Sequence, residues 1–202
     1  MFDVLIVGGG VSGISCALIL GSASRKPFVT EKKIGIVTHQ KTSSLQEALF
    51  NNAYGIAPGK MGTDLLIEST DQLAELYPHV VQIDHEKVLQ IKGTAPNFTV
   101  VTNKNIYHTK LMVVAIGYSN TFAIEGLMAY VATHPKAIPH KQRIWLKNND
   151  HKVDEGIYVA GTLAGWRSQL AIAAGSGAAV ATDILTLWND GIDSQSHDSL
   201  KK

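Results

Sequence analysis

The sequence has one cysteine, almost no net charge and no long apolar run, and each of these absences excludes a class of protein. With Cys16 alone among 202 residues, there is no disulfide framework and no two-cysteine redox centre within one chain. A formal net charge of +1 argues against nucleic acid as the main partner. No uninterrupted apolar stretch reaches the roughly 20 residues needed to cross a bilayer. Because Asp3 stands so early, we also expect no signal peptide, and therefore a cytoplasmic protein that binds neither nucleic acid nor membrane.

The remaining composition is that of one soluble globular domain. The chain is 45% hydrophobic and 17% charged, and its length suits one sizeable domain better than two. Its eight histidines show no metal-ligand spacing, so we expect no metal site. Solvated roles are predicted for His134 and His140 in particular. We predict a single domain over residues 1–190 and a mobile polar tail over residues 191–202.

A glycine-rich turn near the N-terminus carries the first chemical signal. Residues 2–7 form a short apolar run typical of a buried parallel strand, and residues 11–20 carry apolar side chains at helical spacing. Between them, Gly8 permits a tight turn, Gly10 lets backbone approach a pyrophosphate, and Gly13 allows close helix-to-strand packing. The positive end of the helix also favours phosphate. We therefore predict a dinucleotide pyrophosphate on Gly8, Gly10, Val11, Ser12 and Gly13.

The residue that follows the second strand is open to two interpretations. A ribose-binding acid is expected roughly 20 residues after the glycines, and Glu31 lies 18 residues after Gly13. This interpretation takes residues 28–30 as the strand. The apolar run 34–38 is the better strand, and in that case His39 takes the cofactor-binding place and no carboxylate is present. We favour His39, which leaves Glu31 as a solvated loop charge.

The middle and the end of the chain complete an α/β pattern. An amphipathic helix is predicted over residues 62–76, and a buried strand over 156–160 precedes a long helix over 168–189. The sequence therefore predicts a three-layer α/β, Rossmann-like domain with a parallel sheet, helices on one side and a β-meander on the other. Three β-rich runs separated by turn residues form this meander: 88–92, 98–102 and 106–116.

A second glycine-bearing segment lies near the C-terminus. Ala160 and Gly161 end a strand, and after a loop Gln169 precedes Ala-Ala-Gly-Ser-Gly at residues 173–177. Here the sequence resembles the FAD domain of the thioredoxin reductase-like flavoproteins, within the pyridine nucleotide-disulfide oxidoreductase superfamily. Two distant motifs in the right order make the resemblance more specific than either one alone. It covers residues 2–117 and 155–188.

The resemblance implies an FAD-dependent oxidoreductase. Asn52 falls where the family has an asparagine on the flavin side, and Ala115 and Gly117 match its Ala-Thr-Gly after the returning strand. The helix after Gln169 would point backbone N–H groups at the flavin, where reduction places negative charge. The additional FAD contacts that the resemblance implies are Asn52, Ala115, Gly117, Gly161, Thr162, Gln169 and Leu170.

Three departures from the family limit the activity that is expected. Thr162 replaces an aspartate that binds the ribityl chain, so a charge-assisted contact is lost. Residues 118–154 form a short linker in place of the family's NADPH domain, which needs on the order of 100 residues. The Cys-x-x-Cys pair is absent, and Cys16 is predicted to be a buried core residue. We therefore expect that the chain does not reduce thioredoxin. The hydride would come from a small substrate, from NAD(P)H docked on the flavin, or from a partner protein.

Several alternatives stay open at this point. The glycines and alanines of 165–181 indicate either a flat cofactor or another helix at very short distance. Trp166 and Arg167 line either the flavin or the surface, and no catalytic side chain is identified. The face left by the missing domain indicates a homodimer or a redox partner. A non-catalytic flavin-binding module and a scaffold that has lost FAD are the competing functions.

Overall fold

The computed structural model describes residues 1–39, 45–118 and 121–197. Its centre is a sheet in the order β11-β12-β8-β1-β2-β5, with β6 and β7 continuing from β8. Pairing is parallel between β1 and its neighbours β2 and β8, between β8 and β12, and between β2 and β5. The bounds of the parallel strands are β1 Phe2–Val7, β2 Ile34–Thr38, β5 Val81–Asp84, β8 Ile106–Val114 and β12 Ile157–Val159.

Apolar residues on both faces explain why this sheet is buried. In β1, Val4 and Ile6 belong to a core cluster shared with the helices, whereas Leu5 and Val7 belong to a second cluster on the opposite face. Alternate residues of a strand point to opposite faces, so a continuous apolar run fills two cores. This two-sided burial is the expected behaviour of strands in a parallel sheet.

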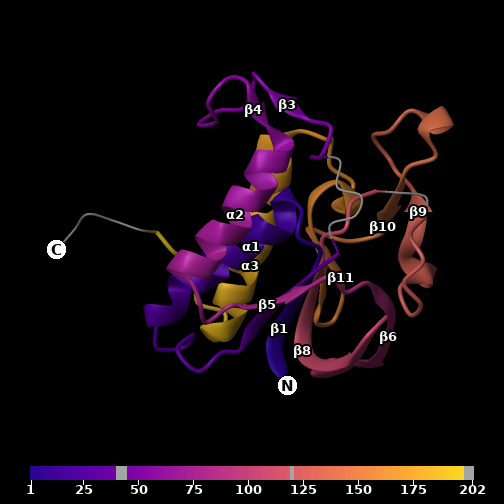
Figure 1. Cartoon of the computed structure of the whole chain (residues 1–202). Helices are drawn as coiled ribbons and strands as arrows, with labels where there is room; N and C mark the ends of the chain where they lie inside the picture. Colours follow the sequence, from indigo (N-terminus) through magenta and orange to yellow (C-terminus); the bar gives the residue numbers. More distant parts are fainter. Residues whose placement is uncertain (40–44, 119–120, 198–202) are drawn as a thin grey trace.

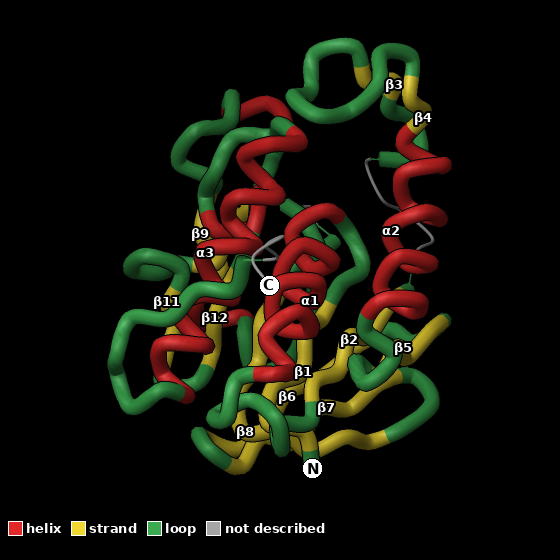
Figure 2. The backbone as a smooth tube through the Cα atoms, turned by 90° about the vertical axis from the view of Figure 1, so that its left-hand side faces the viewer, coloured by secondary structure: helices red, strands yellow, loops and turns green. Residues whose placement is uncertain are grey.

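The α-helices cover one face of the sheet (Figure 1). The long C-terminal helix lies against the first helix, and the view in Figure 2 shows the same pair side by side. The helix bounds are α1 Val11–Ser22, α2 Gly62–Leu76 and α3 Leu170–Trp188. By length and composition α3 is the one helix in the described part of the chain that could cross a membrane. Val180 and Ile184 of α3 are fully buried in the core, however, so it is packed as a core helix.

The predicted meander lies on the other face. Its strands are β6 Val88–Thr94, β7 Asn97–Thr102 and the first half of β8, paired antiparallel. Buried Glu86, just before β6, accepts hydrogen bonds from Thr102, Asn105 and Tyr107 around the turn between β7 and β8. Burial alone would raise the pKa of the Glu86 carboxyl, but these hydrogen bonds outweigh it and hold that pKa below its ordinary value.

The described residues of the linker, 118 and 121–154, fold as a small unit beside the meander. It contains the antiparallel pair β9 Val131–Thr133 and β10 Ile144–Leu146, followed by β11 Lys152–Asp154 at the sheet edge. At the top of the view in Figure 1, the short strands β3 Leu49–Phe50 and β4 Lys60–Met61 pair above the start of α2. The loop between them is therefore closed by a two-strand ladder.

The structure also describes the end of the second strand and the start of the C-terminal tail. The second strand is Ile34–Thr38 with His39 directly after it, and Glu31 is an exposed turn residue. The start of the predicted mobile tail contacts α1, since Ser22 Oγ donates to Ser196 Oγ at 2.8 Å. The rest of that tail, residues 198–202, lies outside the described residues.

Candidate functional site

The glycine turn after β1 has two packed positions and one open position. A Cβ added to Gly8, where φ is +116°, would lie 2.5 Å from the Ala115 carbonyl oxygen. A Cβ on Gly13 would lie 1.9 Å from the carbonyl oxygen of Gly8. Gly10, by contrast, has no heavy atom within 4 Å of its added Cβ. The outer glycines thus serve the tight turn and helix packing, while the middle one faces space that a ligand can occupy.

The second glycine segment reaches the same place. Gly161 follows β12 with φ +74°, and a Cβ added to it would lie 2.6 Å from Ser12 Oγ. Ser12 stands in the first turn of α1. The carboxyl ends of β1 and β12, far apart in sequence, therefore meet across this serine.

Both α1 and α3 begin without a side-chain cap. The N-cap of α1 is Gly10 and that of α3 is Gln169, and neither makes a side-chain capping hydrogen bond. Neither helix has an acidic residue in its first turn. The first N–H groups of a helix have no partner within it and attract anions. The first turns of α1, with Val11, and of α3, with Leu170, are therefore free to bind negative groups of a ligand.

Close packing between α1 and α3 explains part of the glycine and alanine content. A Cβ on Gly177 would lie 2.0 Å from the carbonyl oxygen of Ser12, and Ser15 Oγ donates to the Ala174 carbonyl at 2.9 Å. Gly175, two residues earlier, has nothing within 4 Å. The helix contact therefore accounts for Gly177, and it leaves Gly175 beside open space.

The linker holds the loop that carries Thr162. His134 Nε2 lies 3.1 Å from the Thr162 carbonyl oxygen, and His134 Nδ1 accepts a hydrogen bond from the Lys136 N–H. Because Nδ1 is the acceptor, the neutral ring carries its proton on Nε2 and donates it to Thr162. Asn148 Nδ2 also donates to the Ala164 carbonyl at 3.2 Å. The prediction that His134 is solvated is wrong, since the residue is 6% exposed; His140 is exposed.

A second buried histidine is linked to Gly161 through a serine. The Gly161 N–H donates to Ser176 Oγ at 2.7 Å, and His151 Nε2 lies 2.9 Å from the same oxygen. His151 also stacks on Trp166, with ring centroids 6.2 Å apart and planes at 24°. Trp166 therefore packs against the linker, and Arg167 is exposed to solvent.

The sheet edge beyond His39 supplies a carboxylate that the sequence interpretation missed. Thr38 ends β2 and pairs in register with Asp84, the last residue of β5. Thr38 Oγ1 donates to Asp84 Oδ1 at 2.6 Å. The acid absent after β2 is thus present on the neighbouring strand. An apolar strand residue, Ile83, followed by an aspartate was the available signal, but the run was not recognised as a parallel strand.

The other predicted FAD contacts are Ala115, Gly117 and Asn52. Ala115 is buried beside the glycine turn, and Gly117 adopts φ +83° with open space around it. Asn52 is exposed in the loop between β3 and β4. Within the described ranges, no hydrogen bond joins Asn52 to another predicted site residue. Its neighbour Asn51 accepts the Gly59 N–H at 2.8 Å.

Thiol and metal chemistry receive no support from the described residues. Cys16 is fully buried, as predicted, and burial raises the pKa of its thiol far above the ordinary value. In residues 1–39, 45–118 and 121–197 there is no group of three histidine, cysteine or acidic side chains that could hold a metal ion.

Comparison with known proteins agrees with this geometry. The family profile described as pyridine nucleotide-disulphide oxidoreductase matches residues 2–163. The chain belongs to that family. Family membership implies an oxidoreductase with a flavin cofactor and a dinucleotide-binding Rossmann-like fold. No curated protein sequence matches the chain.

Solved structures with the same fold include several thioredoxin reductases. A thioredoxin reductase from Gloeobacter violaceus is 15% identical with a TM-score of 0.74, covering 99% of both chains. An oxidoreductase from Agrobacterium tumefaciens is 14% identical with a TM-score of 0.73, covering 92% of this chain and 98% of its own. A ferredoxin-flavin thioredoxin reductase from Clostridium acetobutylicum is 14% identical with a TM-score of 0.68, covering 94% and 98%. These likenesses confirm the fold of a thioredoxin reductase-like FAD domain.

Proposed function

We propose that the chain is an FAD-dependent oxidoreductase of reduced, single-domain architecture. The observation that carries the proposal is the meeting of Gly161 with Ser12, which brings the end of β12 to the uncapped start of α1. We infer a cofactor crevice that runs from there to the uncapped start of α3. Open space at Gly10 and Gly175 fits a flat dinucleotide lying along this crevice. We also propose a cytoplasmic location and neither a nucleic-acid nor a membrane partner, in keeping with the formal net charge of +1.

Each part of the crevice has a distinct role toward the cofactor. The pyrophosphate would lie on the N–H groups of Val11 and Ser12 at the start of α1. The start of α3 at Leu170 would stabilise negative charge on the ring. When bound, FAD supplies the hydride chemistry; the protein binds, orients and electrostatically tunes it. Thr162 offers a hydroxyl at the place of the family's aspartate, with its backbone fixed by His134.

Asp84 is our assignment for the adenosine ribose. A carboxylate near the end of the second strand binds ribose hydroxyls in this type of fold. Here His39 follows β2, and the Asp84 carboxylate lies one strand farther out, oriented by Thr38. Adjacent strands are about 4.8 Å apart, so this carboxylate is displaced from the usual place by about one strand spacing.

The electron donor is NAD(P)H or a small substrate that reaches the flavin directly, or a partner protein. Residues 118–154, between the two FAD-type segments, are too few for a second nucleotide domain, and Cys16, the single cysteine, is buried. The exposed apolar side chains of Ile116 and Ile172, 42% and 36% exposed, are consistent with a covering subunit or redox partner on this side.

Anaerobic mixing with NADH or NADPH tests the proposal. The FAD-loaded protein is mixed with each nucleotide while the flavin absorbance is followed. Rapid bleaching by one of the two supports the oxidoreductase. FAD that binds but stays oxidised with both nucleotides supports the second candidate, a flavin-binding module within a larger redox assembly. That candidate is favoured by Thr162 and by the lack of an identified acid or base in the crevice.

A further inference from the structure

The linker between β8 and β12 carries basic side chains without acidic neighbours. From residue 126 to residue 149 the sequence has no aspartate or glutamate, whereas it has Lys136, Lys141, Arg143 and Lys147. Arg167, in the loop that this linker holds, adds a fifth cation. Within the described ranges, none of these five side chains forms an ion pair. The five cations form what we call the basic surface, whose charge no direct ion pair neutralises.

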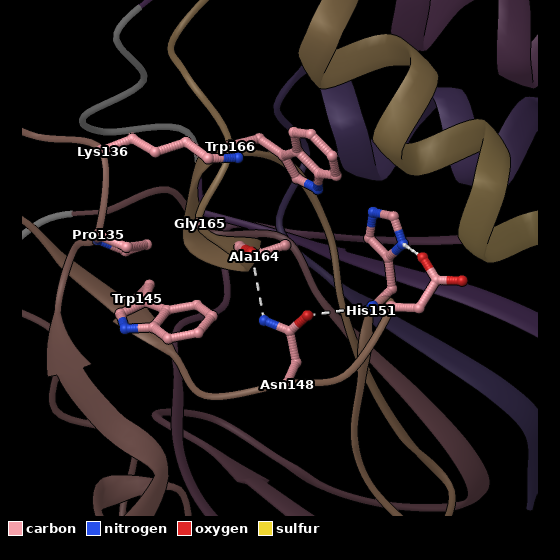
Figure 3. A pocket seen from close by; sticks show the side chains of 9 residues that line it. Pro135, Lys136, Trp145, Asn148, His151, Ala164, Gly165 and Trp166 are labelled. Carbon is pink, nitrogen blue, oxygen red and sulfur yellow. Dashed lines mark hydrogen bonds and ion pairs between the residues drawn. The ribbon is translucent and has the colours of Figure 1, made fainter.

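Two of these cations lie on aromatic rings next to the predicted FAD-binding segments. Lys136 Nζ is 4.1 Å from the centre of the Trp166 ring, and Figure 3 shows the lysine side chain extended toward this indole. The Arg143 guanidinium carbon is 4.0 Å from the centre of the Tyr118 ring. Tyr118 directly follows Gly117, and Trp166 lies in the loop that follows β12. Cation–π contacts of this kind hold the two charges beside the cofactor crevice.

The basic surface also exposes apolar side chains. Ile138, between Lys136 and Lys141 in sequence, is 51% exposed, and Trp166 is 42% exposed. Aromatic residues and arginine are enriched in protein interfaces, whereas a nucleic-acid-binding domain is strongly basic as a whole, and this chain has a net charge of only +1. Because the charges are distributed along the linker as far as Lys147, they suit an extended acidic face better than one small anion. These features favour an acidic protein as the partner.

We propose that the basic surface docks an acidic electron-carrier protein. Opposite charges steer such a partner and speed its association, and Tyr118 and Trp166 place the docked partner beside the cofactor crevice. The role of the partner as an electron carrier rests on the proposed function, but the docking itself does not require FAD. Two successive dockings of a one-electron carrier, each oxidised by one electron, would reduce one FAD by two electrons, with a proton taken from solvent.

Binding of an acidic flavodoxin to the full chain, measured by titration calorimetry, tests the docking. We expect the affinity to fall at least about tenfold as the ionic strength rises from about 10 to about 100 mM, because the screening length falls from about 30 to about 10 Å. Phosphatidylserine vesicles and a DNA duplex, measured under the same conditions, represent the other anionic partners. No detectable binding of flavodoxin, or tighter binding of the vesicles or the duplex, would overturn the proposal.

Charge-reversal variants locate the docking site on the chain. Lys141→Glu combined with Lys147→Glu changes exposed lysines of the linker and should weaken flavodoxin binding at least about tenfold. Arg25→Glu combined with Lys87→Glu makes the same change in net charge at exposed cations outside the linker, and it should change the affinity by less than about twofold. Both variants should keep the wild-type Tm. Equal weakening by the two variants would show that net charge, and not the basic surface, binds the probe.

Measurements with and without FAD separate this inference from the proposed function. We expect flavodoxin to dock on the chain in both states, because the basic surface is made of protein side chains alone. A chain that binds FAD but no flavodoxin contradicts only the docking proposal. A chain that docks flavodoxin but takes up no FAD contradicts only the proposed function.

Discussion

Gly177 and Gly175 form a matched pair that tests the packing of α1 on α3. In Gly177→Ala the new Cβ would lie 2.0 Å from the Ser12 carbonyl oxygen, whereas real Cβ contacts are essentially never under 3.0 Å. The helices must therefore separate by about 1 Å, and such overpacking costs about 1–3 kcal/mol. Gly175→Ala meets no atom within 4 Å and gains the higher helix propensity of alanine, about 0.5–1 kcal/mol.

Both variants gain this propensity, so the expected difference between them is the overpacking cost, about 1–3 kcal/mol. For a chain of this size, 1 kcal/mol corresponds to about 2–4 °C in Tm, so Gly177→Ala should melt about 2–12 °C below Gly175→Ala. Thermal unfolding followed by circular dichroism, without added cofactor, measures this difference. Equal melting temperatures would refute the close helix contact and return both glycines to the cofactor interpretation.

Three further predictions concern separate parts of the molecule. The wild type should prefer FAD over its 2′-deoxyadenosine analogue by about tenfold, and Asp84→Asn should abolish this preference. Asp71→Asn is the control and should retain it. If the wild type binds FAD without this preference, only the ribose assignment is wrong. Because the pKa of Glu86 is lowered in the folded state, its ionised carboxylate stabilises the fold above the unfolded pKa of about 4.3. This contribution is lost as pH falls through the folded pKa. The Tm gap between wild type and Glu86→Gln should therefore be widest near neutral pH and shrink below about pH 4, and a constant gap would contradict the linkage. Cys16 should react with a thiol reagent only after unfolding; fast reaction of the native protein would show that its burial is wrong.

The elements with strong local signals were predicted well. The glycine turn, the amphipathic helix over residues 62–76 and the meander each combine periodicity with turn chemistry, and the structure has them within a few residues. The second strand was also predicted correctly, since an unbroken apolar run suits a strand buried on both faces. Here local preference and tertiary packing favour the same structure.

The parts that were missed depend on contacts between distant segments. His134 is buried because the linker segment over residues 131–146 lies against the loop carrying Thr162, and no periodic pattern indicates that contact. The role of Asp84 depends on the pairing of β5 with β2, which strand order decides. The two explanations of the small residues in α3 could not be separated by composition, because Gly177 and Gly175 differ only in what lies opposite them.

Binding of FAD to the purified chain and to Gly10→Ala tests the central claim most directly. Gly10 has an ordinary φ of −80° and open space around it, so alanine should leave the fold and the Tm without cofactor unchanged. We predict that the wild type binds FAD, with the visible bands of bound flavin, and that Gly10→Ala binds it at least about tenfold more weakly, or ~1.4 kcal/mol. A wild-type protein that stays colourless and takes up no FAD at equilibrium, or a variant that binds FAD equally well, would contradict the account.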